Sequence, residues 1–380
     1  MPSLSTTYRQ AFPACAGHAY LNCAAVAPGS TRVRAAINTW LDDHVAHGNT
    51  ASAAWWERAA EVRARTAELV GASAEEIVFV RSTSQGLALV AEGLDWRPGD
   101  EVAVASALEY PSNVYAWKHL ASRGVRVREI RVTDGAVTPE AVEEAIGPRT
   151  RLVAVSAVQF ASGHRTDVDT IGRLCRDRDV LFVVDAIQQA GAFPIDVKAS
   201  GIHAIAACSH KWLLGLIGIG FLYVDRDLLP NLRPALVGWH SVEDAFAFDG
   251  TRFDLRTDAS RLEEAAPTFP MVYGLGAAVD MLLEAGVTHT AAHITALLDR
   301  AAGALEAVGC EVSPAPEHRA GILMIKPPSA DVDALAEACA ERHIAVSVRR
   351  GRLRLSAHIY NNEDDIDALV DLLRNPSPNM

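Results

Sequence analysis

The sequence lacks the features of a membrane, secreted or metal-binding protein. No apolar run reaches the roughly 18 residues that a membrane-spanning helix needs, so we expect no membrane contact. The first twenty residues contain no basic start followed by an apolar core, which argues against a signal peptide. The six cysteines are scattered, and neither CxxC nor HExxH occurs, so we expect no disulfide framework and no metal site. These absences predict a reduced, cytoplasmic protein.

An excess of positive charge is also missing. The formal net charge is −12, which argues against nucleic acid or an anionic membrane as the main partner. The composition is otherwise that of an ordinary globular protein, with 49% apolar and 22% charged residues. A chain of 380 residues is too long for one simple core and suggests two domains.

Short apolar runs alternate with helix-like segments from about residue 76 onward. Six runs have the character of strands: EIVFV (76–80), EVAVAS (101–106), VRVREI (125–130), RLVAVSAV (151–158), VLFVVDA (180–186) and IGIGFLYV (217–224). Apolar strands separated by helices predict an α/β fold with a mainly parallel sheet covered on both faces. Ligands of such sheets bind beyond the carboxyl ends of the strands.

The last third of the sequence predicts a smaller α+β unit. A long helix is expected over 287–309, a strand over 321–327 and a second helix over 332–343. Two strands, IAVSVRR and RLRLSA, follow on either side of a turn at Gly351, and a last helix covers 364–374.

Lys211 lies in the stretch CSHKWLLG, between a small polar pair and an apolar run. Lysine is expensive to bury and usually stays exposed. One interpretation is therefore a surface lysine on a connection. The other is a Schiff-base lysine, whose amine is made nucleophilic by desolvation and by its neighbours.

Asp185 follows the apolar run VLFVV at the expected carboxyl end of a strand. A carboxylate in that position must find a cation or become neutral. The protonated ring nitrogen of pyridoxal phosphate is such a cation, whereas a helix cap or a structural ion pair is the simpler interpretation. Gln188 has room to reach a ring oxygen, although it is equally an ordinary polar loop residue.

The stretch VRSTSQGLAL (80–89) places small hydroxyl residues between a strand and a helix. Such a helix N-terminus offers backbone amides and hydroxyls to an anion such as phosphate. Serine, threonine and glycine also simply cap helices, so this signal is weak on its own.

The motif order STSQG, EYPSN, VVDAIQQAG and SHKW resembles class V of the pyridoxal phosphate-dependent aminotransferase superfamily. That class contains cysteine desulfurases, isopenicillin N epimerase-like proteins, kynureninases and related carbon–sulfur lyases. The resemblance runs from YLNCAAVAP (20–28) to RLRLSAHIYNNEDDIDALVDLL (352–373). It implies fold type I, with a seven-stranded, mainly parallel sheet in a large cofactor-binding domain over 20–270. Residues 1–19 and 271–380 would then form the small α+β domain.

The resemblance also implies roles in binding the cofactor, pyridoxal 5'-phosphate. Lys211 matches the Schiff-base lysine, Asp185 the pyridinium partner and Gln188 the donor to the phenolic oxygen. Thr83 and Ser84 match the phosphate-binding pair of the first loop.

Further matches lie on the phosphate side and on the substrate side. His210 and, less clearly, Cys208 match phosphate-side residues, and Tyr110 matches the ring that stacks on the cofactor, unless it is a core aromatic. Asn22 lies where relatives approach the substrate. Arg354 matches the arginine that holds the substrate α-carboxylate by two hydrogen bonds, the alternative being an ordinary arginine on an edge strand.

Two departures from the class pattern bear on the reaction. Cysteine desulfurases of the second group carry a nucleophilic cysteine in a loop before the final arginine strand, but IAVSVRRGRLRLSA (344–357) has neither insertion nor cysteine. Cys339 lies on an apolar helical stripe and is expected in the core. The partner-subunit glycine–threonine pair is also absent, because RLEEAAPTFP (261–270) has Ala265 and Ala266 there; either the contact is lost or Thr268 makes it.

The implied chemistry is removal of the α-proton from an amino acid bound to the cofactor as an external aldimine, which leaves a Cα carbanion. The favoured outcome is a cysteine desulfurase-like carbon–sulfur lyase that acts without a persulfide-forming cysteine. An epimerase or aminotransferase of the isopenicillin N epimerase-like group fits the same sequence. A non-catalytic binding protein is a remote alternative, because the Lys, Asp, Gln and Arg positions are intact. The resemblance further implies a homodimer.

Overall fold

The computed structural model describes residues 3–328 and 331–374, and its larger part is built on a seven-stranded sheet. The strand order is β2-β8-β7-β6-β5-β3-β4. The strands are β2 (Ile77–Val80), β3 (Glu101–Val104), β4 (Arg126–Glu129), β5 (Thr150–Ser156), β6 (Leu181–Asp185), β7 (Ala204–Cys208) and β8 (Gly220–Val224). Only β8 runs antiparallel to its neighbours in this sheet. The predicted α/β fold with a mainly parallel sheet of seven strands is confirmed.

Strand β7 was not among the six strands expected from apolar runs. Its sequence, AIAAC, is rich in alanine, which has low strand propensity, yet every residue of it is buried. The small side chains allow helix α4 (Thr83–Gly93) to approach the sheet closely, because a Cβ on Gly86 would lie 2.8 Å from the Cβ of Ala206. This packing brings the start of α4 to the carboxyl end of β7.

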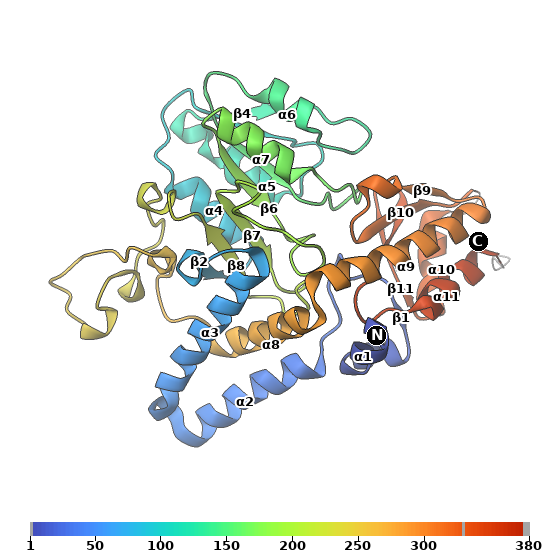
Figure 1. Cartoon of the computed structure of the whole chain (residues 1–380), viewed down its shortest axis with the longest axis horizontal. Helices are drawn as coiled ribbons and strands as arrows, with labels where there is room; N and C mark the ends of the chain where they lie inside the picture. The colour runs from blue at the N-terminus through green and yellow to red at the C-terminus, as the bar shows by residue number, and fades with distance from the viewer. Residues whose placement is uncertain (1–2, 329–330, 375–380) are drawn as a thin grey trace.

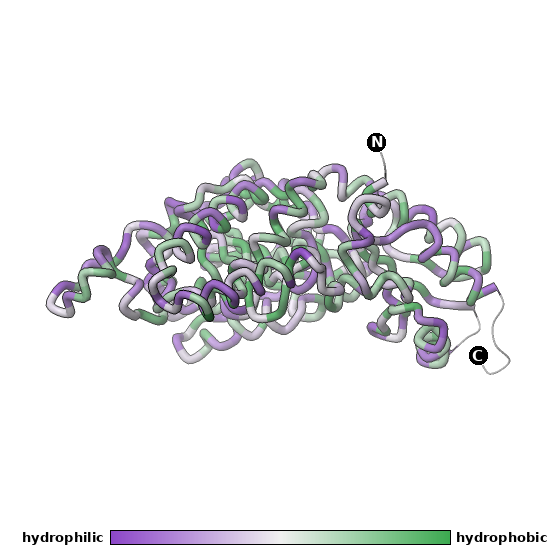
Figure 2. The backbone as a smooth tube through the Cα atoms, turned by 90° about the horizontal axis from the view of Figure 1, so that it is seen from below, coloured by the Kyte–Doolittle hydropathy of each residue, from purple (hydrophilic) through white to green (hydrophobic). Residues whose placement is uncertain are grey.

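Helices cover the sheet as expected for a doubly covered α/β layer. Figure 1 shows α2 (Thr31–His47), α3 (Ser52–Val70) and α8 (Phe269–Ala285) together at one side of the sheet, and both α2 and α3 pack on α8. The other helices of this part are α5 (Ser112–His119), α6 (Pro139–Ala145) and α7 (Val168–Asp177). Figure 2 shows the apolar segments gathered in the middle of an elongated chain.

A smaller unit at the right of Figure 1 contains an antiparallel sheet in the order β12-β13-β10-β9. Its strands are β9 (Glu311–Ser313), β10 (Ile322–Lys326), β12 (Ser347–Arg349) and β13 (Arg352–Ser356), and its helices are α9 (Val287–Ala307), α10 (Val332–Glu341) and α11 (Glu363–Arg374). Near the N-terminus, α1 (Leu4–Tyr8) precedes β1 (Ala19–Tyr20), which pairs in parallel with β11 (Ile344–Ala345). The expected domain boundary near residue 270 stays a prediction; the helix that follows it, α8, packs on α2 and α3.

Two further features concern the molecular surface. Residues 236–257, between β8 and α8, extend from the body at the left of Figure 1 and expose Phe246, Phe248 and Phe253. Within the described part of the chain, no single helix is long and apolar enough to cross a membrane. The pair α8 and α9 passes that test on length and composition, with a bend of 77° between the two helices.

Candidate active site

A cavity of about 430 Å³ lies at the carboxyl ends of β6 and β7 and is bordered on one side by β12 and β13. This volume is within the usual range for small-molecule sites, roughly 300–1,000 Å³. Nine residues expected at the site line it: Thr83, Ser84, Tyr110, Asp185, Gln188, Cys208, His210, Lys211 and Arg354. Asn22 is not among the lining residues, and its side-chain amide donates a hydrogen bond to the carbonyl of Val346 at 3.3 Å.

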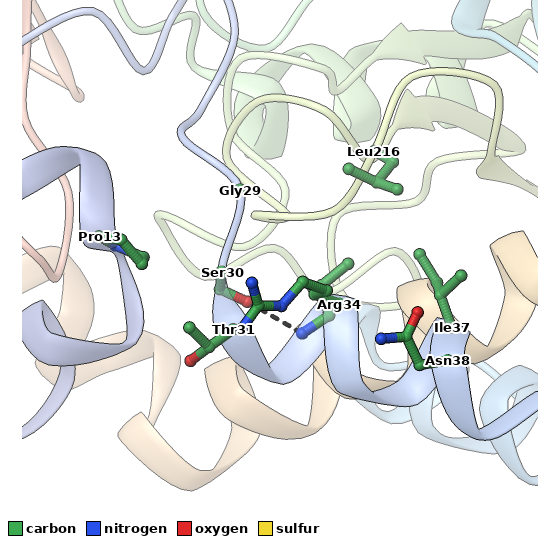
Figure 3. Close-up of a pocket in the computed structure, with 9 residues that line it drawn as sticks. Pro13, Gly29, Ser30, Thr31, Arg34, Ile37, Asn38 and Leu216 are labelled. Carbon is green, nitrogen blue, oxygen red and sulfur yellow. Dashed lines mark hydrogen bonds between the residues drawn. The ribbon is translucent and has the colours of Figure 1, made fainter.

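A separate cavity of about 330 Å³ lies at the start of α2 (Figure 3). The Ser30 hydroxyl accepts a hydrogen bond from the backbone N–H of Val33 at 3.1 Å and so caps the helix. The only charged side chain in its lining is Arg34. None of the predicted site residues reaches this cavity, so it does not compete as the active site.

Lys211 lies in the turn after β7, and its amine points into the larger cavity. Its Nζ atom lies 5.8 Å from the centroid of the Tyr110 ring. Burial, the largest cause, and the charge of Arg354 together lower the pKa of Lys211 to about 8, while Asp185 opposes the shift. A larger share of neutral amine at neutral pH makes the lysine a better nucleophile and proton acceptor.

Trp212, which sequence reasoning did not single out, fixes the turn that carries Lys211. The indole is fully buried and donates a hydrogen bond from Nε1 to Oε1 of Gln188 at 2.7 Å. A Cβ on Gly321 would lie 2.0 Å from the indole ring. Only glycine at position 321 therefore allows the small unit to pack directly on Trp212. Because Oε1 of Gln188 accepts from Trp212, its Nε2 is the donor end, and it donates to the carbonyl of Ala24 at 3.2 Å.

Asp185 is a buried carboxylate at the end of β6, with 2% of its surface exposed. Its Oδ1 accepts a hydrogen bond from the backbone N–H of Ile187 at 3.0 Å. No cation of the described residues lies within ion-pair distance of it. Burial raises the pKa of Asp185, and the nearby Glu109 raises it further, while Lys211 lowers it. A buried carboxylate without a cation is suited to receive a positively charged group of a ligand.

Glu109 is a second buried carboxylate that sequence reasoning missed. It accepts hydrogen bonds from the backbone N–H and the hydroxyl of Ser156, from Nε2 of Gln159 and from Nδ2 of Asn113. Ser156 lies directly opposite Asp185 in the pairing of β5 with β6. Burial raises the pKa of Glu109, and these four donors oppose that shift. Glu109 thereby anchors the segment that carries Tyr110 to the strand beside Asp185.

The N-terminal end of α4 lines the cavity. The hydroxyl of Ser82 caps the helix by accepting the N–H of Gln85 at 3.1 Å. Thr83 accepts the backbone N–H of Cys208 at 3.1 Å, and the hydroxyls of Ser84 and Ser112 are 2.7 Å apart. Hydroxyls and helix-terminal amides that face a cavity fit a phosphate group. Ser82 and Ser112 are additions to the predicted set.

His210 and Cys208 lie beside this end. The Nδ1 atom of His210 is 3.1 Å from Sγ of Cys208, and that thiol donates a hydrogen bond to the carbonyl of Ile219 at 3.2 Å. Burial lowers the pKa of His210 to about 4, and Lys211 adds to the shift, so the imidazole is neutral at neutral pH.

Arg354 on β13 also lines the cavity and is 2% exposed. Its Nε donates to the hydroxyl of Ser347 at 3.2 Å and its Nη1 to the carbonyl of Phe160 at 3.1 Å. Its Nη2 is buried without a hydrogen-bond partner in the described chain. Burial lowers the pKa of Arg354 to about 10, and the neighbouring Arg349 contributes. An unsatisfied guanidinium edge is suited to bind a carboxylate.

These observations fit pyridoxal phosphate together with an amino acid. The cavity offers a nucleophilic amine, an uncompensated buried carboxylate, an anion-binding helix start and a guanidinium group with a free edge. Lys211, Asp185, Gln188 and the start of α4 would hold the cofactor, and Arg354 would hold the substrate.

Comparisons with known proteins agree with this geometry. A model of the aminotransferase class-V family matches residues 19–369. The chain is 31% identical to a probable cysteine desulfurase of Methanothermobacter thermautotrophicus over 96% of each protein. It is 29% identical to an uncharacterized aminotransferase of Bacillus subtilis over 98% of each protein. A solved complex of the cystine C–S lyase C-DES with its reaction product cysteine persulfide is similar in fold, with a TM-score of 0.90 and 23% identity over 97% of this chain and 100% of that one.

Proposed function

The chain belongs to the aminotransferase class-V family and is a pyridoxal phosphate-dependent enzyme, and from this premise we propose that it is a carbon–sulfur lyase acting on a cysteine-like amino acid. The observation that carries the proposal is the meeting of Lys211, Asp185 and Arg354 around one cavity, in a chain similar to a probable cysteine desulfurase. A fold like that of a cystine C–S lyase is consistent with it.

Each residue has a defined task in this proposal. Bound pyridoxal phosphate supplies an electron-withdrawing ring that stabilises negative charge at the substrate Cα. Arg354 binds the α-carboxylate and so fixes the orientation of the substrate. Lys211, whose pKa burial lowers to about 8, accepts the α-proton and can pass it to the departing sulfur, which leaves Cβ with the electron pair of the broken carbon–sulfur bond. Asp185 holds a positive charge at the buried end of the cavity, and Tyr110 covers the space above Lys211.

The proposed reaction needs no protein cysteine as sulfur acceptor. The β12–β13 connection is a two-residue turn of Arg350 and Gly351, and Arg350 ties it to the carbonyl of Ala107 at 2.6 Å. All six cysteines are buried and free. Burial raises the pKa of Cys339 to about 12, and Cys208 uses its thiol proton in a hydrogen bond to a carbonyl. These contacts support release of the sulfur with the product.

A product assay tests the proposal. The holoenzyme is incubated with L-cysteine, L-cystine and S-alkyl-L-cysteines, and we expect pyruvate, ammonia and a sulfide, persulfide or thiol. Cys208→Ser, Cys310→Ser and Cys339→Ser are assayed singly and should keep carbon–sulfur cleavage. Loss of cleavage in one of them, with cofactor binding and α-proton exchange intact, would restore a protein-bound persulfide and overturn the proposal.

An aminotransferase or an amino acid epimerase is the second candidate. The short turn at Arg350 and Gly351 favours it as much as the lyase, and one relative at 29% identity is named an aminotransferase. Its signature is a keto acid formed without sulfide, or a D-amino acid. Either product in place of pyruvate would assign the chain to this group.

We also propose a homodimer located in the cytoplasm. The arm over 236–257 exposes Phe246 at 56%, Phe248 at 76% and Phe253 at 68%, and exposed apolar surface of this kind is typical of protein interfaces. The six free cysteines agree with a reducing compartment. Light scattering at micromolar concentration tests the dimer, and a fully active monomer would contradict it.

A further inference from the structure

The active-site cavity contains a second guanidinium group, that of Arg349, which none of the roles above uses. Arg349 and Arg354 both line the cavity. Ser347 lies directly opposite Arg354 in the pairing of β12 with β13, and Arg349 follows Ser347 by two residues on the same face of β12. The two guanidinium groups therefore project from the same face of this two-strand ribbon into one space.

The four arginines around this turn differ in what they contact. Arg350 donates a hydrogen bond to the carbonyl of Ala107, which belongs to the part of the chain built on the seven-stranded sheet. Arg352 forms an ion pair with Glu311. Arg354 has a structural anchor at Phe160 and one free edge. Arg349 donates only to the carbonyl of its own neighbour, Val348, at 2.7 Å, and the described chain brings no carboxylate within ion-pair distance of it. Within residues 3–328 and 331–374, no fold-stabilising contact accounts for a guanidinium group there.

The charges of the cavity point to a substrate with two anionic groups. Asp185 is the only acidic side chain among the described lining residues, and its charge interacts with that of Lys211. One amino-acid carboxylate satisfies the free edge of Arg354. A second cation on the same wall then remains without an anion, unless the substrate brings one.

We infer that Arg349 binds a second anionic group at the end of the substrate side chain. The preferred substrates are α-amino acids whose side chain ends in a carboxylate, sulfinate or sulfonate, including sulfur-linked conjugates that end in such a group. Arg354 holds the α-carboxylate, and the more exposed Arg349 selects the distal anion. The inference rests on the proposed function only in requiring that the cavity binds an α-amino acid.

The test uses two ligands that differ in charge and hardly in shape. S-carboxymethyl-L-cysteine and S-carbamoylmethyl-L-cysteine are titrated into the holoenzyme, and the dissociation constants are taken from the change in cofactor absorbance. We expect the charged ligand to bind about tenfold more tightly, which corresponds to about 1.4 kcal/mol. Arg349→Gln should abolish this preference, and Arg349→Lys should keep part of it. Arg352→Gln, on the same sheet face but outside the cavity lining, is the matched control and should keep it fully.

The possible results separate this inference from the lyase proposal. Equal affinities in the wild type, or a preference that survives Arg349→Gln, would overturn the role of Arg349, as would failure of both ligands to bind. An Arg349-dependent preference without formation of pyruvate would uphold the inference and remove the lyase assignment. An Arg349-dependent preference with pyruvate formation would uphold both.

Discussion

The two sides of the active-site cavity differ in how completely their polar groups are satisfied. On the sheet side, Glu109 receives four hydrogen bonds and Gln188 is oriented by the indole of Trp212. On the side of the small unit, Arg354 keeps a buried Nη2 without a partner among the described residues, and the one hydrogen bond that the Arg349 guanidinium group donates to them goes to its neighbour's carbonyl. Apart from Asp185, which has no cation beside it, the first side is organised before any ligand arrives, whereas the second is completed by a ligand.

This difference suggests that the sheet side binds the cofactor and that the side of the small unit binds the substrate. A group that stays bound through many turnovers benefits from side chains that are fixed in advance. A substrate that enters and leaves must itself supply the missing hydrogen-bond partners. Substitutions on the sheet side should therefore alter cofactor binding and turnover together, while substitutions on β12 and β13 should alter substrate affinity alone.

Of these substitutions, Lys211→Ala should cause the largest loss of turnover. The amine serves both as the attachment point of the cofactor and as the proton acceptor, so turnover should fall by at least about 10⁴-fold. Borohydride treatment should attach the cofactor to Lys211 in the yellow wild-type protein and leave the variant unlabelled, as mass spectrometry of the peptides would reveal. A colourless wild-type protein after expression with ample pyridoxine would remove the basis of the sheet-side assignment.

Asp185→Asn should come next, with turnover reduced by about two to three orders of magnitude. Breaking a buried charge pair costs about 3–5 kcal/mol, and about 1.4 kcal/mol corresponds to tenfold in rate. The absorbance maximum of the bound cofactor should shift as well, because the charge beside its ring changes. Asp167→Asn, which alters the cap of α7, is a control expected to leave turnover unchanged. Wild-type rates in the Asp185 variant would mean that this carboxylate is only structural.

Arg354→Gln should affect the substrate and spare the cofactor. Hydrogen bonds to a charged group contribute about 1.5–3 kcal/mol, so KM should rise about 10- to 100-fold. The cofactor spectrum without substrate should match that of the wild type, because Arg354 lies on the ligand-completed side. A spectral change as large as that of the Asp185 variant would erase the distinction between the two sides.

The sequence predicted the sheet side better than the other side. Asp185 and Gln188 follow the apolar run of β6, so their place at the carboxyl edge of the sheet follows from the strand pattern, whereas Lys211 follows β7 and was assigned from the motif resemblance. The choice among the arginines of RRGRLR depends on the β12–β13 register, which sequence alone does not fix. Glu109 was missed because three of its four hydrogen-bond donors come from Ser156 and Gln159, which are far along the chain, and β7 was missed because its alanines carry no strand signal.

The last prediction concerns the point where the two sides meet, at His358. The imidazole is fully buried; its Nε2 donates to the carbonyl of Trp212 at 3.0 Å, and its Nδ1 accepts the backbone N–H of Ile359 at 2.8 Å. This pairing requires the neutral ring, and burial lowers the pKa of His358 from 6.5 to about 3. The unfolded chain therefore binds more protons than the folded one between these values, and stability is lost as pH falls through 6.5.

From pH 7 to pH 5 this one residue should cost about 2 kcal/mol of unfolding free energy. His358→Gln should be less stable than wild type at pH 7, by about 1–2 kcal/mol for the lost hydrogen bonds. At pH 5 the difference between the two proteins should shrink by about 2 kcal/mol, since the variant has no imidazole to protonate on unfolding. Urea unfolding at both pH values measures this difference, in which the contributions of the other histidines cancel. If the difference in unfolding free energy between the two proteins is the same at both pH values, His358 takes up a proton in the folded state. The contact with Trp212 would then not hold the Lys211 turn as described.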